Sequence, residues 1–149
     1  MSIAFDTNVL VYAVDRSQGD RHRMALLLIE RALRQRRAVL ILQTMVEFYA
    51  VTTGKLKGRP EDALRFLDRL RAVLAVYAAD TRDFDRATGG AGHGLSFWDA
   101  LLWATADRIG VRYLLTEDFQ DRRALGGVTF VNPFQGRNDP LLAEILPLS

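Results

Sequence analysis

The fold is decided by the stretch Ser2-Ile3-Ala4-Phe5-Asp6-Thr7-Asn8-Val9-Leu10-Val11-Tyr12-Ala13-Val14. Its residues 2–5 form a short apolar run, which predicts a strand that enters a core. Asp6 ends this run, and Val9–Val14 then predict a helix. A strand followed at once by a helix is the beginning of a βα unit, so we expect strands and helices to alternate along the chain.

The rest of the chain continues this alternation. Further strands are predicted at Val39–Leu42, Val76–Ala78, Val111–Leu115 and Val128–Val131. Helices are predicted at His22–Arg36, at Thr44–Thr53, from Pro60 with Leu64, Leu67, Leu70 and Leu74 on its buried face, from Asp80 to Thr88, and from Ser96 to Gly110. The order predicts an α/β fold, a three-layer α/β/α sandwich with a mainly parallel central sheet. Ligands of such sheets bind beyond the carboxyl ends of the strands.

Composition limits what the protein can be. The 149 residues include 20 Lys and Arg against 18 Asp and Glu, and 49% are hydrophobic, which predicts one domain over residues 1–149. The absence of Cys excludes a disulfide scaffold, a thiol nucleophile and a Cys-based metal site, and it fits a reducing cytoplasm. No segment is apolar enough to cross a bilayer, and no signal peptide is recognisable, so we expect no membrane association.

Four acidic residues lie in apolar surroundings, unlike most of the others. Asp6 follows the strand at residues 2–5, and Asp118 follows the strand at residues 111–115 by a short step. Glu47 and Asp99 lie in apolar runs that are expected to form first turns of helices. A carboxylate among apolar neighbours is unfavourable unless it is paired or bound to a metal. These four residues are therefore the candidate catalytic and metal-binding groups.

Each of these acids also has a structural interpretation. Thr44-x-x-Glu47 has the pattern of a capping box, and Ser96-x-x-Asp99 imitates it with a shorter acid. Asp6 is placed to cap the helix that follows it, and Asp118 to stabilise a turn. The two interpretations are compatible, because an acid at the start of a helix can both cap the helix and face a site.

Taken together the four acids are more informative, because all are expected at one edge of a parallel sheet. Two carboxylates about 5 Å apart repel each other by roughly 3 kcal/mol at an effective dielectric constant of 20. Such a cluster takes up protons or binds a cation. The ligands would all be hard oxygens, which favours Mg²⁺ or Mn²⁺ over zinc. Held in this way, Mg²⁺ serves the hydrolysis of phosphodiesters without a protein nucleophile.

Five motifs, in this order, resemble those of PIN-domain ribonucleases. They are Phe5-Asp6-Thr7-Asn8-Val9-Leu10, Glu47-Phe48, Ser96-Phe97-Trp98-Asp99-Ala100-Leu101 with Ala104-Thr105-Ala106, Leu114-Leu115-Thr116-Glu117-Asp118-Phe119, and Val131-Asn132-Pro133-Phe134. The similarity runs from Ile3 to Phe134, and the short layout resembles the VapC-type toxins of bacterial toxin–antitoxin pairs. The resemblance implies a Mg²⁺-dependent endoribonuclease that acts on RNA, forms a homodimer and is inhibited by a cognate antitoxin.

The resemblance also implies a set of site residues. The acids of the family fall on Asp6, Glu47, Asp99 and Asp118, and its supporting polar groups on Asn8 and Thr116. Asp6 and Asp99 are the expected direct metal ligands, while the other two acids complete the site through water or a second ion. Glu117 and Asp121 lie close to Asp118 in the sequence, and whether either shares its role stays open.

Two alternatives belong to other functional classes. A phospho-receiver or a phosphatase of the haloacid dehalogenase type also has acids at strand ends, but both normally need a nearby lysine. Lys55 and Lys57, the only lysines, lie in a polar run between helices. The other alternative is a PIN-like module that binds partners without catalysis.

Basic residues are needed around an acidic pocket that receives RNA. Three runs qualify: Arg31 to Arg37, Lys55 to Arg59, and Arg122-Arg123. Such contacts give affinity but no sequence specificity. The apolar faces of the helices at 22–36 and 60–74 are candidates for an antitoxin groove, although core packing explains most of their leucines.

Overall fold

The structure is a computed structural model that describes residues 2–148. Its central sheet has the strand order β1-β4-β6-β5. Strands β1 (Ser2–Phe5), β4 (Val111–Leu115) and β6 (Val128–Val131) are parallel, and β5 (Ala124–Leu125) runs antiparallel to β6 at the edge. A second parallel pair, β2 (Leu40–Ile41) with β3 (Val76–Tyr77), lies beside β1, to which Ala38 is joined by a parallel bridge.

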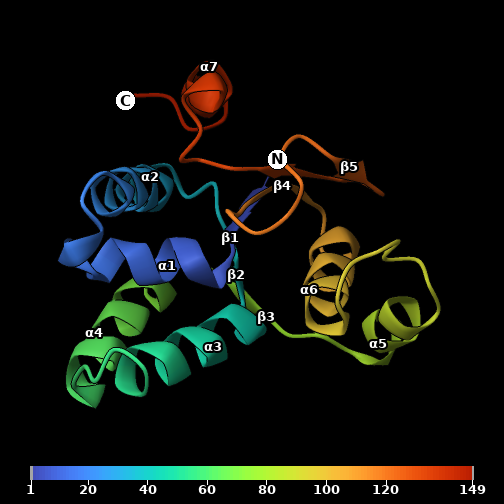
Figure 1. Cartoon of the computed structure of the whole chain (residues 1–149), viewed down its shortest axis with the longest axis horizontal. Helices are drawn as coiled ribbons and strands as arrows, with labels where there is room; N and C mark the ends of the chain where they lie inside the picture. The colour runs from blue at the N-terminus through green and yellow to red at the C-terminus, as the bar shows by residue number, and fades with distance from the viewer. Residues whose placement is uncertain (1, 149) are drawn as a thin grey trace.

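Helices cover both faces of the sheet (Figure 1). One side carries α1 (Thr7–Val14), α2 (Asp20–Gln35), α3 (Leu42–Thr53), α4 (Pro60–Arg71) and, near the C-terminus, α7 (Asp139–Ile145). The other side carries α5 (Thr81–Thr88) and α6 (Phe97–Arg108). Two short 3-10 turns, η1 (Arg16–Gln18) and η2 (Gly136–Asn138), complete the chain. The expected three-layer α/β/α arrangement with a mainly parallel sheet is therefore confirmed.

Neighbouring residues of each strand pack against different layers. In β1, Ile3 and Phe5 join the core beneath α1 and α2, whereas Ala4 joins the core beneath α6. In β4, Leu115 joins the core beneath α1 and α2, and Leu114 joins the core beneath α6. Because successive side chains of a strand point to opposite faces, short apolar runs in these strands fill two cores at once. None of the helices within residues 2–148 combines the length and apolarity that spanning a bilayer requires.

The structure changes several predicted boundaries. Helix α1 begins at Thr7 rather than Val9, because the Asp6 side chain accepts the Thr7 N–H and caps the helix. The predicted strand at 39–42 is reduced to β2, and α3 begins already at Leu42 instead of Thr44. Leu64, expected on the buried face of α4, is 48% exposed. Strand β5 and helix α7 were not expected, because both are short.

Candidate functional site

The register of the parallel strands builds one edge of the site. Phe5 pairs with Leu115, and Leu115 pairs with Val131. The next residues continue the ladder: the Asp6 N–H donates to Leu115 O at 2.9 Å, and the Thr116 N–H donates to Val131 O at 2.9 Å. Asp6 and Thr116 therefore lie side by side at the carboxyl ends of β1 and β4, where a ligand site was expected.

Asp6 is the most buried acid of this edge, with 6% of its surface exposed. One carboxylate oxygen accepts the Thr7 N–H at 2.7 Å, and the other accepts the Thr116 hydroxyl at 2.8 Å. Burial raises the pKa of Asp6 from 3.8 to about 6 although these two hydrogen bonds oppose the rise, and the charges of Asp118 and Asp99 add to it. Asp6 thus caps α1 and also faces other carboxylates.

Asp118 lies in the loop after β4 and is exposed. Its carboxylate accepts the Asn8 side-chain amide at 3.0 Å, and its backbone N–H donates to the Thr116 hydroxyl oxygen at 3.1 Å. Thr116 therefore connects two acids, since the same hydroxyl donates to Asp6. Asn8 and Thr116, proposed from the sequence as supporting groups, each contact an acid directly.

Glu47 approaches from α3. It lies in the second turn, because α3 begins at Leu42 and Thr44 donates its hydroxyl to Ile41 O within the first turn. The capping-box interpretation of Glu47 is therefore wrong. Its carboxylate accepts the hydroxyl of Thr7 at 2.8 Å and the amide of Gln43 at 3.0 Å.

Sequence reasoning missed the two residues that hold Glu47. Thr7 belongs to the Asp-Thr-Asn motif but not to the predicted site, and Gln43 lies outside every motif. Gln43 also donates to Trp98 O at 3.0 Å, which joins α3 to the first turn of α6. The available signal was the spacing of Gln43 and Glu47, because residues four apart on a helix lie on one face.

Asp99 lies in the first turn of α6, as expected. Ser96 caps the helix and its hydroxyl oxygen accepts the Asp99 N–H at 3.3 Å. Burial raises the pKa of Asp99, and the charges of Asp118 and Glu47 also raise it, while a hydrogen bond with Ser96 opposes the rise. The cap and the electrostatic contact with the other acids occur together, so the two interpretations of Asp99 are compatible.

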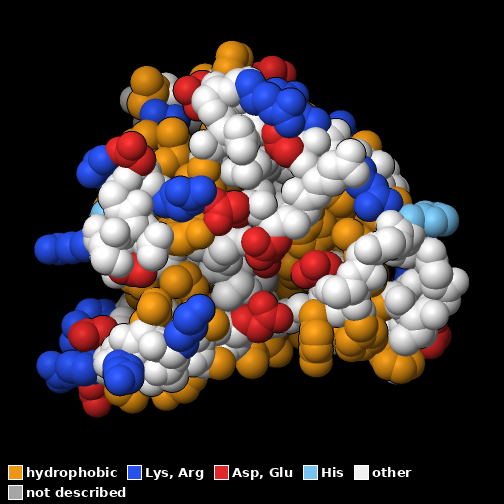
Figure 2. All heavy atoms as spheres, in the orientation of Figure 1, with side chains coloured by type: hydrophobic (Ala, Val, Ile, Leu, Met, Phe, Trp, Pro, Cys, Tyr) orange, Lys and Arg blue, Asp and Glu red, His pale blue; other side chains and the backbone are white. Residues whose placement is uncertain are grey.

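We call Asp6, Glu47, Asp99 and Asp118 the acidic cup. Figure 2 shows acidic side chains gathered in a hollow at the middle of one face, between the side of α1 and α3 and the side of α6. Within residues 2–148 none of the four makes a salt bridge with Lys, Arg or His. The possible metal ligands are all carboxylate oxygens, and their negative charges repel one another. A hard divalent cation prefers oxygen ligands and would reduce this repulsion.

The cup is open rather than closed around a point. Among the described residues, no three His, Cys, Asp or Glu side chains are arranged to hold a metal ion by themselves. Mg²⁺ usually keeps several waters and takes only one or two protein carboxylates. An open set of carboxylates is therefore compatible with a hydrated Mg²⁺, whereas it lacks the compact ligand shell of a structural zinc site.

The neighbouring acids Glu117 and Asp121 have other partners. Glu117 accepts the hydroxyl of Tyr12 at 2.6 Å and the guanidinium of Arg21 at 2.5 Å. Asp121 makes a salt bridge with Arg137 at 2.6 Å and accepts the side-chain amide of buried Asn138 at 3.0 Å. Burial would raise the pKa of Asp121, but these bonds and the Asn132 N–H lower it overall. Asp121 is thus neutralised within the chain.

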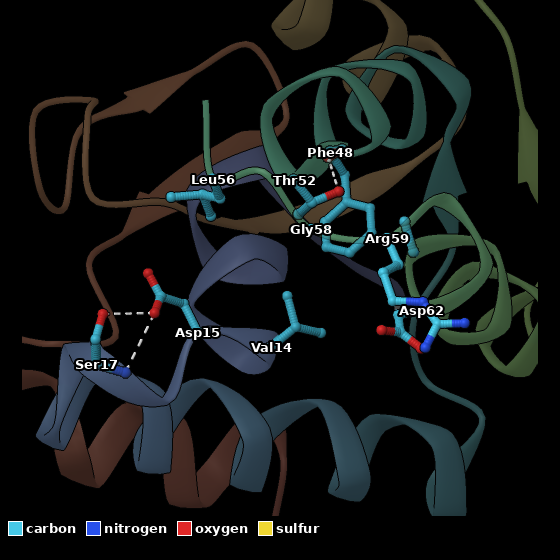
Figure 3. A pocket seen from close by; sticks show the side chains of 10 residues that line it. Val14, Asp15, Ser17, Phe48, Thr52, Leu56, Gly58, Arg59 and Asp62 are labelled. Atoms are coloured by element: carbon cyan, nitrogen blue, oxygen red, sulfur yellow. Dashed lines mark hydrogen bonds between the residues drawn. The ribbon is translucent and has the colours of Figure 1, made fainter. Parts of the chain in front are cut away.

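Two connected hollows lie along α1 and α3, and the first of them contains residues of the cup. One, of about 480 Å³, runs along α1 and α3 and is lined by Asn8, Glu47 and Asp118 from the site and by Lys55 farther out. The other, of about 460 Å³, lies between α1, α3 and the start of α4 (Figure 3). Asp15 and Leu56 line both, so together they form one groove that leaves the cup.

The predicted basic runs are only partly available to a ligand. Arg31 and Arg37 donate to the carbonyls of Leu146 and Ile145, near the C-terminal end of α7. The guanidinium of Arg122 donates to Asn138 at 2.5 Å. These arginines therefore have structural roles, which sequence spacing alone does not reveal.

Comparison with known proteins agrees with the fold. The family model described as "PIN domain" matches residues 3–124. The chain belongs to the PIN domain family. The matched residues include α1, α3, α6 and the loop after β4, and therefore all four acids of the cup. A comparison of this PIN domain with curated protein sequences found no significant match.

Solved structures share the fold of this PIN domain. VapC20 of Mycobacterium tuberculosis, a sarcin–ricin loop cleaving toxin, superposes with a TM-score of 0.61 at 18% identity over 78% of this chain and 90% of its own. A toxin–antitoxin complex from Klebsiella pneumoniae gives 0.61 at 24% identity over 90% and 99%. VapBC2 of Rickettsia felis, bound to a DNA fragment from its promoter, gives 0.58 at 16% identity over 87% and 97%.

Proposed function

We propose that this PIN domain is a divalent-metal-dependent endoribonuclease and the toxin of a toxin–antitoxin pair. The observation that supports the proposal is the acidic cup: Asp6 and Asp118 follow β1 and β4, the charges of the cup acids act on Asp6 and Asp99, and none of the four has a basic partner among residues 2–148. Such a cluster takes up protons or binds a cation from solution, and a bound divalent cation lets the acids stay charged at neutral pH. Membership of the PIN domain family supports the same assignment.

The residues divide into ligands and holders. We propose Asp6 and Asp99 as direct ligands of Mg²⁺ or Mn²⁺, with Asp118 and Glu47 acting through water or a second ion. A bound Mg²⁺ would neutralise phosphate charge and lower the pKa of a coordinated water. The holders are Thr116 on Asp6, Asn8 on Asp118, and Thr7 with Gln43 on Glu47.

The proposal is tested by cleavage of an RNA pool, read by sequencing the new ends. We expect cleavage in Mg²⁺, none after chelation and recovery on adding Mn²⁺. Asp6→Asn should abolish cleavage. The control Glu30→Gln removes an acid of α2 that pairs with Arg69 of α4, and it should leave cleavage unchanged. Cleavage that survives chelation, or an Asp6→Asn protein that cleaves as well as the wild type, would contradict the proposal.

The same protein distinguishes the phospho-transfer alternative. Lys55 lines the same hollow as Asp118, so a lysine is present beside the site and this alternative needs its own test. A receiver or phosphatase would form an aspartyl phosphate after treatment with acetyl phosphate, whereas the nuclease would not. Detection of that adduct on Asp6 or Asp118 by mass spectrometry, together with inactivity on RNA, would favour the alternative. A PIN-like binding module would give neither product.

We also propose that a cognate antitoxin covers the groove between the cup and the cavity in Figure 3. The groove has apolar walls, among them Phe48 and Leu56, the acids of the cup at one end, and Lys55 and Arg59 farther out. It therefore suits a protein segment with apolar side chains along its length and basic side chains toward the cup. The partner is expected from a small adjacent gene. Adding it should stop RNA cleavage, and Leu56→Glu should weaken its binding without changing cleavage by the free toxin.

The expected homodimer has a candidate surface that adjoins the cup, because Glu47 also lines it. Leu42, Val46 and Trp98 are 42%, 58% and 61% exposed and line one cavity with Ala78 and Ala79, with no Lys or Arg among the lining residues. Apolar side chains also follow the lower edge of Figure 2. A surface without positive charge suits a second copy of the chain better than RNA. Light scattering should give the mass of a dimer, and Val46→Glu should yield monomers.

A further inference from the structure

Glu117 and Asp118 are adjacent in the loop after β4, yet their carboxylates have different partners. Glu117 accepts the hydroxyl of Tyr12 at 2.6 Å with one oxygen and the Arg21 guanidinium at 2.5 Å with the other. Asp118 accepts the amide of Asn8. The Glu117 side chain is 21% exposed and Arg21 is 50% exposed, so the ion pair lies at a partly covered edge of the site.

One face of α1 receives both acids. Asn8 and Tyr12 are four residues apart on this helix and therefore share a face. Asn8 also accepts the Glu117 backbone N–H at 3.4 Å through its side-chain oxygen. The loop is thus attached to α1 at two successive residues, through three groups whose geometry is set by the helix.

The partners of Glu117 are themselves held in place. The rings of Tyr12 and Phe134 pack edge to face at 5.2 Å, and the Arg21 guanidinium lies 6.0 and 5.8 Å from their centres. A cation near aromatic rings at these distances is attracted to them. Burial, with the contact to Glu117, raises the pKa of Tyr12 to about 12, so its hydroxyl remains a donor at neutral pH.

We propose that Glu117 is a positioning residue for the acidic cup. Clamped by Tyr12 and Arg21, it fixes the loop after β4 in the conformation in which Asp118 meets Asn8 and faces the other acids. Glu117 itself binds neither metal nor substrate. The inference rests on the proposed metal-dependent nuclease, and it explains why an acid next to a site residue is neutralised by an arginine from α2.

The test is an isothermal calorimetric titration of the metal-free protein with Mn²⁺, which measures the Mn²⁺ affinity. We expect Tyr12→Phe and Glu117→Gln each to weaken Mn²⁺ binding about tenfold, the size of effect that groups behind a metal ligand usually have. The double variant should be no weaker than Glu117→Gln alone, because both changes break one clamp. Glu30→Gln is the matched control: it also removes an acid held by arginine, at 2.6 Å from Arg69, and should leave Mn²⁺ affinity unchanged.

Four results would overturn the inference. If Glu117 were a ligand, Glu117→Gln would weaken Mn²⁺ binding while Tyr12→Phe left it unchanged or stronger. If the clamp only stabilised the fold, both variants would melt earlier and bind Mn²⁺ like the wild type. A wild-type protein that binds no Mn²⁺ would remove the proposed nuclease together with this inference, whereas normal binding and cleavage by Glu117→Gln would remove the inference alone.

Discussion

Two groups of acids in this chain differ in what faces them. The first group is paired with arginine: Asp83 with Arg108 at 2.9 Å, Asp107 with Arg86 at 2.8 Å and Asp121 with Arg137 at 2.6 Å. The second group is the acidic cup, in which the nearest recorded partners of the carboxylates are neutral donors such as Thr116, Asn8 and Thr7.

The difference separates acids that hold the fold from acids that are available to a ligand. A buried carboxylate is unfavourable until its charge is balanced. An arginine balances it inside the chain, as Arg108 does for fully buried Asp83. Neutral hydrogen bonds fix a carboxylate without balancing it, so the cup keeps its charge for a cation. An acid that pairs with an arginine is therefore structural, and an acid without such a pair is available to a ligand.

The largest expected effect is the loss of a paired acid. Asp83→Ala removes the fully buried acceptor of the Asp80 N–H and of the Arg108 guanidinium, and should lower the free energy of unfolding by about 3 kcal/mol, because both donors lose this partner. Urea denaturation measures this. Asp62→Ala, which breaks an exposed pair with Arg65 at 3.2 Å, should change stability by less than about 0.5 kcal/mol. Equal effects of the two changes would remove the distinction drawn for Asp83.

A smaller but more specific effect is expected in the cup. Asp99→Asn should lower the rate of RNA cleavage at least about 100-fold, or about 2.7 kcal/mol, while the thermal melt stays at or above that of the wild type. The matched change among the paired acids, Asp121→Asn, should lower the melt and leave Mn²⁺ binding in place. A reversal of the two patterns would show that arginine pairing does not separate structure from function here.

The sequence predicts the acids of the cup because each one interrupts or follows an apolar run whose spacing predicts a strand or a helix. Asp6 and Asp118 follow strands whose parallel register brings their ends together, so the position of each strand also places its acid. Asp99 follows from the same logic at a helix start. Glu47 is found for a partly wrong reason, since its helix begins two residues before the predicted Thr44 and the acid lies in the second turn.

The arginine pairs were beyond sequence reasoning. Asp121 and Arg137 are 16 residues apart and meet only because η2 and α7 fold back against the loop after β4. Neither element has a long apolar period, and buried Asn138, which joins them to Asp121, has no local signature. Long-range polar pairs depend on packing that local patterns do not encode. The sequence selects Asp118 through its place two residues beyond Thr116 in the motif, but it could not show that Asp121 is paired with Arg137.

An intermediate effect concerns stability and pH. The pKa of Asp6 is raised from 3.8 to about 6, so above pH 6 the folded protein carries a charge that is about 3 kcal/mol less favourable than in the unfolded chain. Asp6→Asn should stabilise the metal-free protein by about 1–2 kcal/mol, because the poorer hydrogen bonds of the amide offset part of this gain. The gain should be full above pH 6, shrink as the pH falls from 6 to 4, and vanish below that. A gain that grows on acidification would contradict the raised pKa.

The smallest expected effect tests whether Glu47 belongs to the cup. Thr7→Val removes the hydroxyl that Glu47 accepts at 2.8 Å, while Gln43 still holds its other oxygen. Thr7 only orients Glu47, which is proposed to act through water or a second ion, so Mn²⁺ affinity should fall no more than about threefold, or about 0.7 kcal/mol. Thr53→Val is the control, because the hydroxyl of Thr53 donates only to Tyr49 O within α3. If Thr7→Val bound Mn²⁺ like the control, Glu47 would lie outside the metal environment. The cation would then be bound by three acids: the two that follow β1 and β4 and the one in the first turn of α6.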